Sequence, residues 1–511
     1  MPRTSGPRPG TERAAMTMSP KWKSRFINLH KGVRKQPLEL PKLLGQPLIL
    51  VATDAHAEVE RYLTGLEKLP VFPRHIDLGD KLDRGPEPLA ANHMLEVTNP
   101  PAHRLVGNHD AMWIGAGLGV ERLAIELVRW LMRYNEQDFL VKEMGISLTP
   151  LENFSNKYFA DARGHYKAKL SKSMEAAATY LKIIAEAPYR FPQHKETTLN
   201  QSDLRIRNAL FHDDALADLR PGEKDTFERL TGKAKLDLKD SLYFFHLMGG
   251  LKELTEEEQT VVDHFTDAFR SSHAYFQLVE CMVGRGDAYT TMRMAEGAPY
   301  DILFTHAGIP ITAEGRLAEF NGRKGMEAFD ALENDIRKAI TAWRWFIETG
   351  DKALLEADAD VIDRLGELPW GAESPLYMRE MQTAARAVLE KESGLYEEPE
   401  GPFFSKWVSS EDSQFIHRVC REIGSSFGMD PRRLLIVHGH KPNKKGDFIV
   451  SAGGHDLNID AGTAESYGGN GAFLLIGTNT LLQFSLLNHT FSPVNLNLEY
   501  FGDRKAAQPV V

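Results

Sequence analysis

The stretch HIDLGDKLDRG, residues 75–85, decides the fold. It joins a short apolar run, typical of a buried strand, to a polar loop framed by two glycines. The pattern G-D-x-x-D-R-G specifies five residues, and five residues at about one in twenty each predict roughly one accidental match in several thousand chains of this size. We therefore interpret the loop as functional and not as an ordinary turn.

Two further apolar runs end in polar residues in the same way. Pro47–Thr53 precedes Asp54, and Arg104–Gly107 precedes Asn108. Asp54, Asp80 and Asn108 are spaced by 26 and 28 residues, which is room for a strand, a crossover helix and the next strand. The spacing predicts a parallel βαβα start whose loops meet at the carboxyl ends of the strands, where open α/β sheets bind ligands.

The rest of the chain alternates late strands with two long helical segments. Thr255 and Glu258 form a capping box inside the first segment, and an amphipathic helix is predicted after Val120. Strands are predicted at residues 301–305, 434–437, 456–460, 472–477 and 481–487. We expect an α/β core formed by residues 45–116, 300–311 and 432–490, large helical insertions at 117–299 and 312–431, a disordered tail at 1–20 and a C-terminal extension at 491–511.

Composition narrows the class of protein. The chain has 511 residues, a net charge of -10 and only two cysteines, Cys281 and Cys420, so a disulfide framework and a cysteine-rich zinc site are excluded. It has no run of about 18 apolar residues and no apolar signal segment. We therefore expect a cytoplasmic protein that binds neither membrane nor, given its negative charge, nucleic acid. A homo-oligomer stays open.

The polar residues after the strands are of the types that bind a pair of divalent cations. Such a pair needs one bridging carboxylate and further nitrogen and oxygen ligands for each cation, and it generates a hydroxide nucleophile at neutral pH. Ligands without thiolate favour manganese, iron, zinc or magnesium, and manganese is our first choice. The predicted ligands are Asp54 and His56 for one cation, Asn108, His306 and His440 for the other, and Asp80 as the bridge.

Three further residues in these loops suit catalysis on a phosphate ester. His109 lies beside a predicted ligand, where it can protonate the leaving alkoxide as general acid. Asp83 is placed to orient that imidazole. Arg84 offers a planar fork that matches two phosphate oxygens. The sequence therefore predicts a phosphomonoester hydrolase.

These motifs resemble those of the calcineurin-like metallophosphoesterases, whose pattern is D-x-H, G-D-x-x-D-R-G, G-N-H-[DE], H-G-G and G-H. More narrowly, the chain is similar to class III fructose-1,6-bisphosphatases, and the likeness covers roughly residues 50–477, including Trp113–Ala116, Met144–Leu148 and Ser374–Tyr377. It departs from them in that the chain is shorter, Ala307 and Ala461 replace the usual Gly, and His438 replaces the usual Asn.

The resemblance implies a core of layered sheets flanked by helices. It also implies removal of the 1-phosphate from fructose 1,6-bisphosphate in gluconeogenesis, with manganese. Two other functions stay open. One is a serine/threonine phosphoprotein phosphatase or dinucleotide polyphosphatase with the same core; the other is a catalytically silent scaffold, which the retained ligands and His109 disfavour.

A bisphosphate substrate needs a cationic contact remote from the reacting phosphate. Lys444 and Lys445 follow His440 closely, and Arg379 follows a family-like segment, so all three are candidates. His438 is a candidate for a supporting or substrate-binding role. Remote binding energy also raises the rate of the chemical step, so we expect Lys444→Ala to narrow the preference for fructose 1,6-bisphosphate over fructose 6-phosphate.

Overall fold

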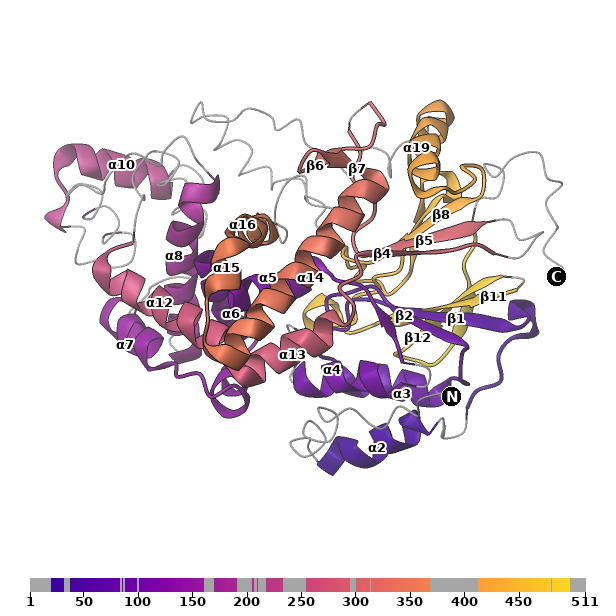
Figure 1. Cartoon of the computed structure of the whole chain (residues 1–511), viewed down its shortest axis with the longest axis horizontal. Helices are drawn as coiled ribbons and strands as arrows, with labels where there is room; N and C mark the ends of the chain where they lie inside the picture. The colour runs from indigo at the N-terminus through magenta and orange to yellow at the C-terminus, as the bar shows by residue number, and fades with distance from the viewer. Residues whose placement is uncertain are drawn as a thin grey trace.

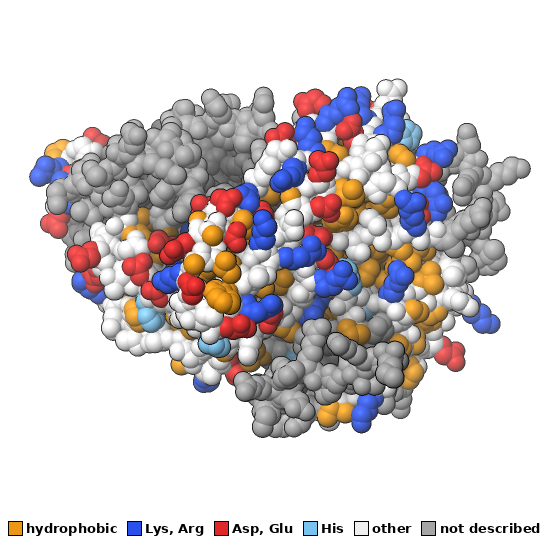
Figure 2. All heavy atoms as spheres, viewed as in Figure 1, with side chains coloured by type: hydrophobic (Ala, Val, Ile, Leu, Met, Phe, Trp, Pro, Cys, Tyr) orange, Lys and Arg blue, Asp and Glu red, His pale blue; other side chains and the backbone are white. Residues whose placement is uncertain are grey.

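The computed structural model shows two larger β-sheets at one end of the molecule and a group of helices at the other (Figure 1). Among the residues it describes, no helix has the length and apolar character needed to cross a bilayer. Charged side chains of both signs are interspersed over the face seen in Figure 2. The described residues are 20–31, 37–82, 85, 88–98, 101–159, 170–190, 205, 209, 217–232, 254–294, 300–312, 314–367, 412–478 and 480–496.

The first sheet carries the predicted parallel start. Strands β1, β2 and β3 run parallel and are connected by helices α3 (Val59–Lys68) and α4 (Pro88–Val97), which confirms the prediction. On its other side β1 pairs antiparallel with β11, so the sheet is mixed. The order across it is β13 (Phe491–Pro493), β12 (Leu481–Ser485), β11 (Ala472–Gly477), β1 (Pro47–Ala52), β2 (Arg74–Asp77) and β3 (His103–Arg104).

The second sheet packs against the first. Ile49 and Ile476 of the first sheet and Phe304 and Val437 of the second belong to one buried apolar cluster. Three neighbouring strands of the second sheet, β5, β8 and β10, run parallel. Its order is β4 (Tyr289–Met292), β5 (Asp301–Thr305), β8 (Leu434–His438), β10 (Asp456–Asn458) and β9 (Ile449–Ser451). Leu50, Leu303 and Ile436, on the opposite faces of these strands, belong to the main core together with residues of the helices. The central strands are thus buried on both faces, which explains their continuous apolar runs.

Two strands of the larger sheets lie outside the ranges predicted for the core. β4 falls within the segment 117–299, and β13 falls within the segment 491–511. Both are short antiparallel edge strands whose side chains are not fully buried. Since an edge strand needs no continuous apolar run, the hydrophobic pattern did not reveal them.

Helices make up most of the described parts of both predicted helical segments. The amphipathic helix after Val120 is α6, and the capping box of Thr255 and Glu258 begins α12 with both reciprocal hydrogen bonds. Helix α5 (Asn108–Leu118) begins within the predicted core and ends at the start of the first segment. The helices of the first segment are α6 (Glu121–Arg133), α7 (Thr149–Tyr158), α8 (Leu170–Arg190), α10 (Pro221–Gly232), α12 (Glu256–Ser271) and α13 (His273–Val283). Those of the second are α14 (Gly325–Thr349), α15 (Ala353–Ala357), α16 (Ala359–Glu367) and α19 (Ser413–Phe427).

Smaller elements complete the described chain. Helix α2 (Pro20–His30) packs its buried Trp22 and Phe26 into the main core. Strands β6 (Glu319–Phe320) and β7 (Arg323–Lys324) form a separate two-stranded sheet. Short helical turns occur at η1 (Lys42–Leu44), η2 (Phe139–Glu143), η5 (Ala452–Gly454) and η6 (Glu465–Tyr467).

Candidate two-metal site

The loops that follow the parallel strands meet at one place between the two sheets. Donor atoms of Asp54, His56 and Asp80 lie within 4.8 Å of one another, and so do donor atoms of Asp80, His306 and His440. Asp80 belongs to both groups. Asn108 joins the second group, because its Oδ1 is 3.0 Å from His306 Nε2 and 2.9 Å from His440 Nδ1. The six residues predicted as ligands are thus neighbours.

The contacts of His306 test whether a cation fits. Its Nδ1 faces the Leu78 carbonyl at 3.0 Å and must donate there, so in the neutral ring Nε2 carries a lone pair. Nε2 in turn faces Asn108 Oδ1 at 3.0 Å and Asp80 Oδ2 at 3.4 Å. Three acceptors therefore converge with no hydrogen between them. Such a cluster requires either a proton on the ring or a cation, and its nitrogen and oxygen donors fit a divalent metal.

The ionisation of these groups follows from their proximity. Burial opposes the charge of His306, yet the carboxylates of Asp80 and Asp54 raise its pKa to about 9. Burial also opposes the charge of Asp80, but the neighbouring His306, His109 and His56 lower the pKa of its carboxyl group. A proton and a metal compete for the same His306 nitrogen, so metal binding at this site displaces a proton.

Backbone conformation holds several of these residues in place. Asp54, His56, Asp80 and His440 have φ values of 47°, 43°, 56° and 70°, in the left-handed region that residues with a side chain rarely adopt. Each such residue costs about 1 to 3 kcal/mol and persists only where its surroundings enforce it. Here two loops bond to each other, since Asp54 N donates to Gly79 O and His56 N donates to Asp80 O, both at 3.0 Å.

The glycines of the motifs allow the loops to approach closely. A Cβ atom on Gly107 would overlap the carboxylate of Asp80, and one on Gly439 would overlap the carboxylate of Asp54. Gly107 has extended backbone, so space and not conformation demands a glycine there. The two glycines thus keep the proposed ligands within reach of one another.

An ion pair beneath the site ties its second and third loops together. Asp110 accepts hydrogen bonds from the backbone N–H groups of Asp80 at 3.0 Å, Lys81 at 3.1 Å and Gly107 at 2.9 Å. The Lys81 ammonium, which is fully buried, donates to Asp110 at 2.8 Å and to the Leu105 carbonyl at 2.5 Å. Lys81 neutralises the carboxylate that holds Asp80 in position.

Lys81→Met is therefore expected to destabilise the protein by about 3 to 5 kcal/mol, because it leaves Asp110 buried without its counter-charge. Urea denaturation followed by circular dichroism measures this loss. Lys142→Met is the matched control, since Lys142 pairs with Asp138 where both side chains are mostly exposed, at 68% and 72%. Removing that pair is expected to cost less than about 1 kcal/mol. Equal stability losses in the two variants would contradict a structural role for Lys81.

His109 lies at the edge of the donor groups. Its backbone N–H donates to Asp80 Oδ1 at 2.9 Å. Its ring makes edge contacts with the rings of His56 and Trp130, at centroid distances of 5.8 Å and 5.4 Å. The imidazole is thus beside the first donor group and outside both metal-ligand groups, as a general acid requires. Asp83, predicted to orient this ring, and Arg84, predicted to bind phosphate oxygens, lie outside the described residues.

The structure describes three of the other residues predicted to bind substrate, namely Lys444, Lys445 and His438. Lys444 and Lys445 are exposed on the loop after His440, and the Lys444 carbonyl accepts a hydrogen bond from Asn470. Arg379 lies outside the described residues. His438 is fully buried, with Nδ1 3.0 Å from the Gly439 carbonyl and Nε2 3.3 Å from Asp456. Both ring nitrogens contact the protein, which favours a supporting role for His438 beneath the loop that carries His440; its predicted binding to substrate stays a prediction.

Two aromatic residues beside the site were not predicted. Tyr467 lies 6.1 Å from His56 between ring centroids, and Trp130 lies next to His109. Neither belongs to a motif, and Trp130 was interpreted only as part of a helical segment. Contacts between segments so far apart in sequence leave no mark in a local pattern.

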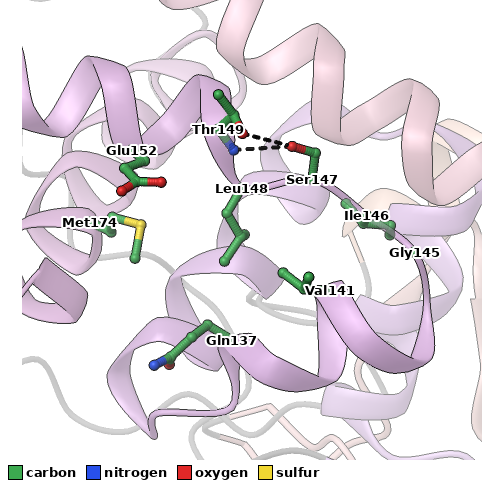
Figure 3. A pocket seen from close by; sticks show the side chains of 9 residues that line it. All are labelled: Gln137, Val141, Gly145, Ile146, Ser147, Leu148, Thr149, Glu152 and Met174. Carbon is green, nitrogen blue, oxygen red and sulfur yellow. Dashed lines mark hydrogen bonds between the residues drawn. The ribbon is translucent and has the colours of Figure 1, made fainter.

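A separate hollow lies among the helices. It has a volume of about 690 Å³, and Figure 3 shows the Ser147 hydroxyl, which accepts from Thr149 N at 3.2 Å, on its wall. Glu152 is the one titratable residue in the lining of this hollow, so the hollow has no set of groups for catalysis. The lining residues are Gln137, Val141, Gly145, Ile146, Ser147, Leu148, Thr149, Glu152 and Met174.

Known proteins match this chain over most of its length. The family model described as Firmicute fructose-1,6-bisphosphatase matches residues 49–496. The class 3 fructose-1,6-bisphosphatases of Fusobacterium nucleatum subsp. nucleatum, Porphyromonas gingivalis and Clostridium beijerinckii are 26%, 27% and 24% identical to the chain over 410, 421 and 440 residues. The matches cover 79% to 82% of this chain and 58% to 60% of those relatives, so the chain spans about six tenths of their length.

Similarity to solved structures is weaker. A cold-active protein-tyrosine phosphatase from a psychrophilic Shewanella species superposes with a TM-score of 0.33 and 13% identity, over 91% of this chain and 84% of that one. A TM-score this low says nothing of a shared fold, and the family match stands on sequence. Because the family model spans nearly the whole described chain, the protein belongs to the Firmicute fructose-1,6-bisphosphatase family.

Proposed function

We propose that the chain is a two-metal phosphomonoester hydrolase with a calcineurin-like metallophosphoesterase core, and that its substrate is fructose 1,6-bisphosphate, cleaved at the 1-phosphate. One observation carries the proposal: a single carboxylate, Asp80, is shared by two groups of metal-type donors. A bridging carboxylate is the feature that a pair of cations requires. The family match and the names of the relatives support the choice of substrate.

The donor residues would hold the two cations in the predicted sets. Asp54, His56 and Asp80 would bind the first, and Asp80, Asn108, His306 and His440 the second. When bound, the metals supply positive charge to the phosphate oxygens and lower the pKa of water so that it is a nucleophile at neutral pH. Manganese remains our first choice for both, because the donors are imidazole, carboxylate and amide.

The residues of the chain orient the ligands and handle the proton. Leu78 O fixes the His306 ring, and the Asp110 carboxylate fixes the backbone of Asp80. His109 would donate a proton to the sugar oxygen as the phosphorus–oxygen bond breaks, which leaves a neutral hydroxyl on the product. Asp83 is proposed to orient His109, and Arg84 to bind two phosphate oxygens.

The alternative functions receive less support than the sugar bisphosphatase. A phosphoprotein phosphatase or a dinucleotide polyphosphatase would use the same donors, and the family match favours the sugar bisphosphate over both. A silent scaffold would not need six adjacent donors, four of them in conformations that cost free energy. The phosphoprotein or dinucleotide phosphatase and the silent scaffold are therefore outcomes of the assay and not proposals.

The expected result is that purified protein with manganese hydrolyses fructose 1,6-bisphosphate with a higher kcat/KM than fructose 6-phosphate. The reason is that fructose 6-phosphate carries no 1-phosphate, so it can react only at its 6-phosphate and without the binding energy of a second phosphate. Steady-state release of phosphate measures both values, with phosphoserine peptides and diadenosine tetraphosphate in the same panel. Zinc, iron and magnesium are compared at equal occupancy. No preference for the bisphosphate would reject the sugar bisphosphatase and point to a broader phosphatase.

A further inference from the structure

A chain of neighbouring rings runs through the candidate site and continues onto helix α6. The centroid distances are 6.1 Å from Tyr467 to His56, 5.8 Å from His56 to His109, 5.4 Å from His109 to Trp130 and 5.5 Å from Trp130 to Tyr134. The proposed general acid therefore lies between the metal donors on one side and the α6 aromatics on the other. Whatever binds above His109 is also close to the end of α6.

The sequence of α6 fixes Trp130 firmly. Glu126, Arg129 and Trp130 lie three and four residues apart and share one face of the helix. The buried Glu126 accepts from the Arg129 guanidinium at 2.8 Å and from Trp130 Nε1 at 3.1 Å. The guanidinium carbon of Arg129 also lies over the Trp130 ring, 4.5 Å from the ring centroid. The charge of Arg129 is thus already neutralised, and the indole is held in one orientation.

Arg133 lies on the same face, one turn further along. Its guanidinium carbon is 5.4 Å from the Trp130 centroid and 6.0 Å from the Tyr134 centroid. The residue is exposed, and within the described part of the chain no carboxylate forms an ion pair with it. Cation–π contacts hold the position of the guanidinium while its N–H edges stay available to an anion.

We propose that Arg133 binds the second phosphate of the substrate, the one that is not cleaved. This inference rests on the proposed function. One 5.4 Å step separates the His109 ring from the Trp130 ring, and a second 5.4 Å step leads from that ring to the guanidinium. A sugar lying over His109 with one phosphate at the metals would direct its other phosphate towards this cation. The planar fork suits two phosphate oxygens.

Arg133 is a better candidate than Lys444 for a physical reason. The Lys444 side chain is exposed, and the contact of this residue within the described structure is made by its backbone carbonyl. An exposed lysine side chain loses its rotamer freedom only when the phosphate binds, whereas the Arg133 side chain is already ordered by two rings. Pre-ordered contacts raise specificity more than flexible ones do.

The test uses the full chain with manganese and compares fructose 1,6-bisphosphate with fructose 1-phosphate, which carries the cleaved phosphate alone. The readout is the ratio of their kcat/KM values. Arg133→Gln is expected to lower this ratio by about tenfold to a hundredfold, the size of a charge-assisted phosphate contact. Arg133→Lys, which keeps the charge and loses the fork, is expected to fall between Arg133→Gln and the wild type.

Two further variants serve as comparisons. Arg323→Gln removes an exposed arginine on β7, so it changes the net charge equally and is expected to leave the ratio at the wild-type value. Lys444→Ala tests the other candidate. If Arg133→Gln leaves the ratio unchanged while Lys444→Ala lowers it, the phosphate contact belongs to the Lys444 loop and the inference is overturned.

The outcomes also separate this inference from the proposed function. If the wild type prefers fructose 1,6-bisphosphate and neither Arg133 variant changes the ratio, Arg133 is not the contact, although the function stands. If the wild type shows no preference, the function and the inference are both rejected. Bound metal and the melting temperature, measured for each variant, show that a lower ratio does not reflect loss of the metal site or of the fold.

Discussion

Asp80→Asn is expected to reduce hydrolysis of fructose 1,6-bisphosphate to background and to lower the amount of bound metal. Asp80 contributes to both donor groups, so its loss removes a ligand from each proposed cation. Asparagine keeps the shape, but it has no negative charge and only one acceptor oxygen. The second oxygen matters, because Oδ1 accepts from His109 N while Oδ2 faces His306 Nε2.

Two measurements on the same sample check this expectation. Elemental analysis gives the metal content after gel filtration, and a phosphate-release assay gives the turnover. Asp447→Asn is the control, since Asp447 is an exposed carboxylate on the loop that follows His440. A variant of Asp80 that kept two metals and near-normal turnover would show that Asp80 is not the bridge.

His109→Ala is expected to keep its metals and to lose about 10² to 10⁴-fold in rate on alkyl phosphates. The ring is outside both metal-ligand groups, so its removal leaves the ligands in place. A sugar alkoxide is a poor leaving group and needs the proton, whereas a nitrophenolate departs without one. Aryl phosphates are therefore expected to lose much less rate than sugar phosphates.

The comparison of leaving groups distinguishes acid catalysis from structural damage. kcat is measured on fructose 1,6-bisphosphate and on p-nitrophenyl phosphate, each with saturating manganese. His417→Ala, at an exposed position on α19, is the matched control. Equal losses on both substrates would mean that the His109 ring is needed for the structure of the site and does not supply a proton, since the variant keeps the backbone N–H that donates to Asp80.

The core of the fold was predictable because its strands are buried on both faces. Each of the three parallel strands at the start gave an apolar run followed by a polar motif, and the structure confirms their parallel order. The pairing of β1 with β11 was not predicted, since antiparallel partners this distant share no local signal. Strands β4 and β13 were not predicted for the related reason that edge strands lack a full apolar run.

The site was predictable to the extent that its residues are fixed by metal chemistry. All six predicted ligands are neighbours in the structure, because the loops that carry them after the strands converge. What the sequence could not give is the packing around them. The buried pair of Lys81 and Asp110 involves a position that the motif leaves unspecified, and Trp130 reaches His109 only through the tertiary fold.

The central place of β1 in the first sheet has a consequence during synthesis. His440 N donates to Asp54 Oδ2 across 386 residues of chain. Strand β1 likewise cannot complete its pairing until β11 has been synthesised. At about 5 to 20 residues per second, a ribosome needs roughly 20 to 80 seconds to make that stretch. Throughout this time one edge of β1 exposes unpaired N–H and C=O groups beside apolar side chains, which invites pairing with other nascent chains. The yield of folded protein in a cell is therefore expected to rise when chaperones shield this edge until the distant partner strand emerges.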